Sequence, residues 1–124
     1  MTTALWCLFG MMLYPFPFAA YAKFSTPGYD NRSPRDFLGG LSGKGQRANW
    51  AQMNHFEAYP PFVAGVLTAH FLGAPQNQID MLAMAYVFFR IIYGILYIAD
   101  LHVWRSVAWA GAFGCVIGLF FISI

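Results

Sequence analysis

Four long apolar segments constrain this chain more than any other feature of its sequence. They cover roughly residues 3–22, 47–72, 79–99 and 103–124. A helix needs about 20 apolar residues to cross the hydrocarbon core of a bilayer, and each segment is that long. Backbone amides in lipid must find their hydrogen bonds within a helix, and the alternating strands of a membrane barrel are absent. The sequence therefore predicts an all-α membrane protein, a bundle of four transmembrane helices that forms a single domain over residues 1–124.

The composition agrees with a membrane protein and excludes several other classes. Hydrophobic residues make up 59% of the sequence and charged residues 10%, whereas a soluble domain has about 25% charged residues. The net charge of +2 is too small and too scattered to indicate nucleic-acid binding. Cys7 and Cys115 lie in apolar segments, and no group of Cys, His or acidic residues has the spacing of a metal site. We expect neither a metal nor a nucleic-acid partner.

The connections between the segments predict how the chain is oriented. Residues 23–46 form a long polar loop rich in Gly, Ser, Pro and charged residues, while residues 73–78 form a short turn without Lys or Arg. Basic residues favour the cytoplasmic side, and here they gather in the long loop and beside the last connection, at Arg105. We expect the long loop to be cytoplasmic and both termini to lie on the other side. The first apolar segment is expected to be an uncleaved span, because no Lys or Arg precedes it.

Two charged residues lie well inside the predicted spans, Glu57 in the second and Arg90 in the third. A charge in the middle of a span costs roughly 2.5–3.5 kcal/mol on insertion scales, so it usually has a partner or a function. Each residue lies about 15 Å from the cytoplasmic end of its span, at 1.5 Å per residue. Because these spans are antiparallel, we expect an ion pair between the two side chains. Such a pair either only locks two helices together or also forms part of a ligand site, and the sequence leaves both open.

Further polar residues continue from this pair toward the long loop. They recur at about one-turn intervals on one face of each helix: Asn54, Trp50 and Arg47 on the second span, and Tyr93 and Tyr97 on the third. This spacing predicts a polar cleft between the two spans that opens toward the basic loop and suits an anionic, amphipathic ligand. His55 points to a different face and is expected to be a helix-contact or interfacial residue.

The segments NHFEAYP and RIIYGILYIADL, together with four short spans, resemble the MAPEG family (membrane-associated proteins in eicosanoid and glutathione metabolism), especially its small bacterial members. The resemblance implies a homotrimer of four-helix protomers in the bacterial inner membrane, with glutathione bound between subunits near the cytoplasmic side. It also implies which residues contact glutathione: Asn54, Glu57, Arg90, Tyr93 and Tyr97.

The resemblance also implies roles for two arginines, Arg105 and Arg47. Arg105 is the nearest match to the arginine that activates the glutathione thiol, since a cation near a thiol raises the thiolate fraction. Members that use glutathione commonly carry an arginine four residues before the asparagine, where this chain has Trp50. Arg47, one turn earlier, is the expected substitute.

Two hypotheses for the function follow. The first is an enzyme, a glutathione transferase or peroxidase that uses glutathione as cosubstrate on a lipophilic small molecule, with Arg105 as its catalytic residue. The second is a non-catalytic module, either a scaffold or accessory subunit of a larger membrane complex or a binder of lipid or another amphiphile. Under both, membrane lipid and further copies of the chain are the expected partners.

Overall fold

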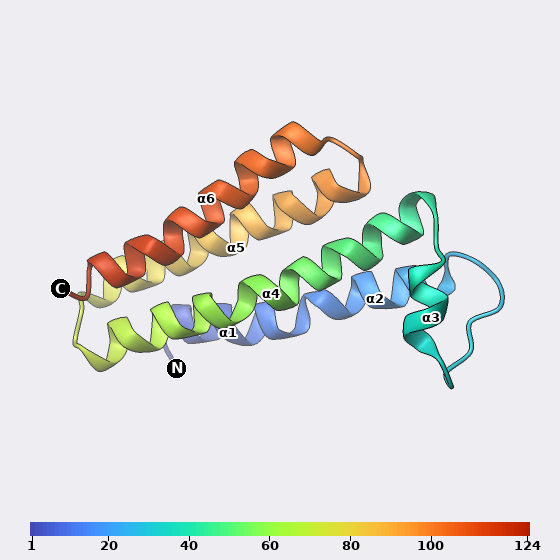
Figure 1. Cartoon of the computed structure of the whole chain (residues 1–124). Coiled ribbons are helices and arrows are strands. Elements are labelled where there is room, and N and C mark those ends of the chain that lie inside the picture. Colours follow the sequence, from blue (N-terminus) through green and yellow to red (C-terminus); the bar gives the residue numbers. More distant parts are fainter.

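Six α-helices and no strands make up the fold in the computed structural model, which describes all 124 residues. The helices are α1 (Thr3–Leu13), α2 (Pro15–Phe24), α3 (Pro34–Gly39), α4 (Gly43–Phe71), α5 (Gln76–Ile98) and α6 (His102–Phe121). The long helices form an elongated bundle, with both termini at the same end as the α4–α5 turn (Figure 1). The short helix α3 and the α5–α6 connection lie at the opposite end, which we call the loop end (Figure 1). The predicted all-α class is confirmed.

Three helical segments are long and apolar enough to cross a membrane. They are Thr3–Phe24, which combines α1 and α2, Gln76–Ile98 and His102–Phe121. Their length and composition agree with an integral membrane protein. The predicted second span corresponds to α4, which is helical throughout but is not among the three. With 29 residues, α4 is about 43 Å long and exceeds a hydrocarbon core of about 30 Å, so four spans remain a prediction.

The first predicted span consists of two helices, and the predicted loop differs in its bounds. The first span is divided at Tyr14, because Pro15 and Pro17 have no N–H to donate to the preceding turn. The predicted loop of residues 23–46 is shorter than expected, since α2 and α4 both extend into it and α3 forms within it. Proline at the start of α3, at Pro34, suits the first helical position, where no N–H is needed.

The same kind of cap ends both α4 and α5. Gly73 follows α4 with φ of 72°, and Asp100 follows α5 with φ of 60°. In each turn the next backbone N–H donates to the carbonyl five residues earlier, at 3.0 Å. This pattern satisfies carbonyls at a helix end and reverses the chain within a few residues. The first turn of α6 is thereby brought back beside the last turn of α5, where the polar residues of α5 end.

The apolar core fills the terminus end of the bundle. The largest group of buried hydrophobic residues joins α1, the second half of α4, the first half of α5 and the second half of α6. Within it the rings of Phe62 and Tyr86 stack with centroids 3.8 Å apart, and the Tyr86 hydroxyl donates to the Ala58 carbonyl at 3.1 Å. Toward the loop end the α5–α6 hairpin diverges from α2 and α4 (Figure 1). The polar residues lie between these two pairs of helices.

Candidate functional site

Arg90, in the middle of α5, is the only buried charged side chain and is 1% exposed. Its Nη2 donates to the Asn54 side-chain oxygen at 2.9 Å and lies 2.6 Å from His55 Nδ1. The guanidinium carbon also lies 4.2 Å from the centroid of the Tyr93 ring. Because arginine only donates hydrogen bonds, His55 accepts at Nδ1 and is assigned as the neutral tautomer. All partners of the buried guanidinium are therefore neutral, and no carboxylate balances its charge.

His55 is held among aromatic rings and is 4% exposed. Its ring centroid lies 4.7 Å from that of Tyr14, 4.9 Å from Phe18 and 5.8 Å from Tyr93. Gly94 makes room for this cluster, since a Cβ there would lie 2.6 Å from the Phe18 ring. The expected helix-contact role of His55 is confirmed. Its hydrogen bond to the guanidinium was not predicted, although its place beside Asn54 at the same depth was a signal.

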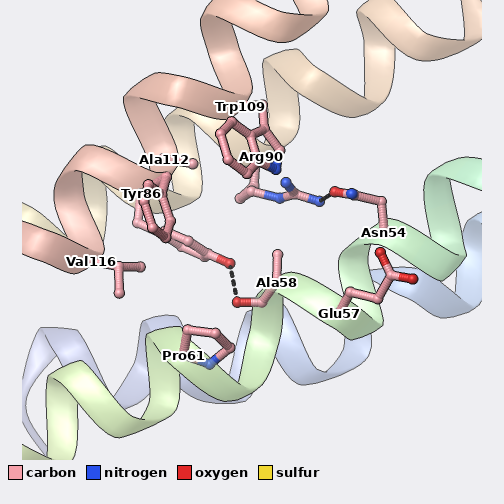
Figure 2. Close-up of a pocket in the computed structure, with 10 residues that line it drawn as sticks. Asn54, Glu57, Ala58, Pro61, Tyr86, Arg90, Trp109, Ala112 and Val116 are labelled. Carbon is pink, nitrogen blue, oxygen red and sulfur yellow. Dashed lines mark hydrogen bonds between the residues drawn. The ribbon is translucent and has the colours of Figure 1, made fainter.

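The predicted ion pair between Glu57 and Arg90 is wrong. Arg90 bonds to Asn54 and His55, and Glu57 is exposed. Figure 2 shows the Arg90 side chain reaching from α5 to Asn54, with the Glu57 carboxylate standing free beside them. The depth estimate gives the height of each residue along its helix but not its direction around the axis. Glu57 is left at an open edge, where its carboxylate can meet another molecule.

Three hollows meet at Glu57. The first, of about 220 Å³, lies between α4, α5 and α6 and is bordered by Arg90 and Trp109 (Figure 2). The second, of about 730 Å³, lies between α3 and the outer face of α4. The third, of about 340 Å³, lies between α4 and α5 and is lined by Trp50, Met53, Asn54, Glu57, Tyr93 and Tyr97. We call this third space the α4–α5 hollow, and it contains most of the predicted polar cleft.

The two remaining candidate cations have different positions. Arg105, in the first turn of α6, places its guanidinium carbon 4.1 Å from the centroid of the Tyr97 ring. It therefore stands beside a ring that lines the α4–α5 hollow. Arg47 instead donates from Nε to the Ile98 carbonyl at 3.0 Å and lines none of the three hollows at Glu57. The candidate residues that line the α4–α5 hollow are Asn54, Glu57, Tyr93 and Tyr97. Arg90 and Arg105 each stack on one of its tyrosine rings, and Arg47 lies outside it.

The sequence model of the MAPEG family matches residues 2–124, essentially the whole chain. The match includes all six helices, and so both helices that line the α4–α5 hollow. No curated protein and no solved structure gave a significant match.

Proposed function

Since the chain belongs to the MAPEG family, we propose that it is a glutathione-dependent transferase or peroxidase that acts on a lipophilic substrate. The family includes enzymes of both kinds. The α4–α5 hollow supports this proposal, because an amide, a carboxylate and two phenols from two helices meet there. Arg90 and Arg105 each stack on one of those phenol rings. Such convergent polar groups in a concave site are typical of ligand-binding sites.

The charges around the hollow complement those of glutathione. Glutathione carries two carboxylates and one ammonium at neutral pH, and the hollow is flanked by two guanidiniums and one carboxylate, Arg90, Arg105 and Glu57. Guanidiniums bind carboxylates with strong, charge-assisted hydrogen bonds. The ring of Trp50, which also lines the hollow, offers a face to an ammonium. A volume of about 340 Å³ lies within the usual range for small-molecule sites, so the donor set and the space both fit glutathione.

Each residue has a distinct role in the proposed reaction. In the transferase reaction the glutathione sulfur bonds to a substrate carbon, the leaving group departs with its electron pair, and the thiol proton is lost to solvent. In the peroxidase reaction two glutathione thiols are oxidised to the disulfide while a hydroperoxide is reduced to an alcohol and water. Arg105 provides a positive charge at the loop end of the hollow, and such a charge favours the thiolate form of a nearby thiol. Arg90, fixed by Asn54 and His55, holds a second positive charge behind the Tyr93 ring, where it would attract a carboxylate without touching it.

A lipophilic substrate has a place beside this polar hollow. The adjoining hollow between α4, α5 and α6 is bordered by apolar side chains of α6, including Phe113 and Val116, and of α4, including Pro61. It meets the α4–α5 hollow at Asn54 and Glu57. An apolar molecule there would lie next to the polar groups that bind glutathione.

The assembly is proposed to be a homotrimer in the bacterial inner membrane, with α4 as the fourth span. In one chain the outer face of α4 is open, and the hollow between α3 and α4 exposes Glu57 together with apolar residues such as Phe56. Neighbouring copies would cover this face and shield the polar half of α4 from lipid. The loop end holds every Lys and Arg except Arg90, which supports a cytoplasmic location for it and the opposite side for both termini.

A non-catalytic scaffold or accessory subunit is the second candidate function. Trp50 stands where an anion-binding arginine is expected, and Arg47 holds the end of α5 through Ile98. Both features favour a chain whose polar cluster only locks helices together. In that case the chain should purify in mild detergent as part of a larger complex.

Calorimetric titration of the detergent-purified protein with glutathione tests the proposed function. We expect binding at millimolar or lower concentration, weakened about 10-fold to 100-fold by Glu57→Gln, because a hydrogen bond to a charged group contributes about 1.5–3 kcal/mol. The exposed loop residue Asp30 supplies the control Asp30→Asn, which should bind like the parent. Arg47→Ala separately tests the predicted contribution of Arg47. No binding by the parent at millimolar glutathione would leave the scaffold as the better account.

A further inference from the structure

A separate groove lies between α2, the start of α4 and the end of α5. It consists of two adjoining hollows of about 260 and 410 Å³, which share Phe18, Lys44 and Ile98. None of its lining residues borders the three hollows at Glu57. The groove is therefore independent of the site proposed for glutathione.

The groove is apolar along its length and has one charge at its end. Two membrane-crossing segments, Thr3–Phe24 and Gln76–Ile98, form its sides. Water would find almost no polar partners in such a groove, so an apolar chain suits it better than water does. Apart from Lys44, the lining side chains carry only one polar group, the hydroxyl of Tyr21.

Lys44 places a positive charge at the loop end of the groove. It is the second residue of α4, at the loop end, and its side chain is exposed. The N-cap residue of α4, Ser42, makes no side-chain hydrogen bond to the helix. The positive end of the helix dipole therefore adds to the attraction of the lysine for an anion.

We propose that this groove binds an anionic phospholipid. The phosphate lies at Lys44, and one acyl chain runs along Phe18 and Ile98 between α2 and α5. Basic pockets between transmembrane helices recognise anionic headgroups in this way, through charge at the membrane surface and an apolar path below it. The proposal does not depend on glutathione binding.

Native mass spectrometry after exchange into mixed phosphatidylglycerol and phosphatidylcholine tests the site. We expect the parent protein to retain phosphatidylglycerol preferentially, and Lys44→Gln to reduce that preference about fivefold, the effect of one basic residue near a membrane surface. Lys23→Gln is the matched control, because Lys23 also lies at the loop end but its ammonium is over the Tyr29 ring, outside the groove. Glutathione binding should be unchanged in both variants.

Ile95→Trp tests the apolar part of the groove without changing charge. Ile95 lines the groove and is 61% exposed, so a larger side chain can be accommodated while it occupies the space of an acyl chain. We expect it to lower the retention of both lipids. Equal effects of Lys44→Gln and Lys23→Gln would overturn the proposal, as would unchanged lipid retention in Ile95→Trp. Loss of subunit association in Ile95→Trp with lipid retention intact would assign the groove to a second copy of the chain instead.

Discussion

Replacing both Asn54 and His55 by leucine should lower the free energy of unfolding by about 3–5 kcal/mol, and adding Arg90→Met should recover most of that loss. The two side chains accept the hydrogen bonds of a guanidinium that is 1% exposed. Without them the chain must fold around a buried charge with no partner. Removing the charge as well leaves a set of apolar side chains, which a membrane protein tolerates.

Reversible unfolding in mixed micelles, followed by tryptophan fluorescence, measures these differences. Arg90→Met alone should lower the free energy of unfolding by less than the double leucine variant does. It leaves two neutral acceptors without a partner, whereas the double variant leaves a charge without one. The matched comparison is Glu57→Gln combined with Arg90→Met, whose effects should add, because no bond joins these side chains. A triple variant as unstable as the double one would contradict this description of the cluster. If the effects of Glu57→Gln and Arg90→Met on the free energy of unfolding are strongly non-additive, the ion pair expected from the sequence exists after all.

Arg105→Ala should lower kcat for glutathione conjugation by about 10²–10³-fold, the usual effect of removing one preorganised charge from a reacting centre. Without the cation, less of the bound thiol is ionised at a given pH. The pH dependence of kcat should therefore move to higher pH in the variant, because the thiol pKa rises toward its ordinary value. The KM for glutathione should change much less than kcat.

Conjugation of chlorodinitrobenzene, followed over a range of pH, separates these effects. Arg105→Lys should retain part of the activity, since it keeps the charge while it loses the planar guanidinium. Arg32→Ala, in the loop before α3, is the control and should behave like the parent. Unchanged kcat and an unshifted pH profile in Arg105→Ala would remove this residue from the catalytic role. Glutathione binding without turnover in any variant would indicate a binding protein.

The long helices were predictable because apolar length is a strong signal in a membrane protein. All four long apolar segments are helical, with ends displaced by a few residues. The sequence did not predict the first turn of α4, because its residues are as polar as those of the loop before it. Contacts distant in sequence stabilise it, since Gly45 packs so closely against Ser25 that a Cβ there would overlap that side chain. Local composition carries no information about such a contact.

The sequence predicts how far along its helix each candidate residue lies, but not in which direction around the helix axis its side chain points. Counting residues placed Asn54, Glu57 and Arg90 near one level, and the structure brings them together around adjoining hollows. Which of them bonds to Arg90 depends on how α4 is turned about its axis, and contacts of His55 with the rings of Tyr14 and Phe18 contribute to that rotation. The position of Arg105 beside Tyr97 depended on the tight turn at Asp100, whose left-handed backbone conformation is not evident from the sequence.

A structure of the protein determined with millimolar glutathione would show whether the α4–α5 hollow binds glutathione. We expect ligand density in the α4–α5 hollow, in contact with Asn54, Glu57 and Tyr97, with the sulfur nearest Arg105. Glutathione density at another place, or an empty hollow at a concentration that saturates the protein in solution, would contradict this expectation.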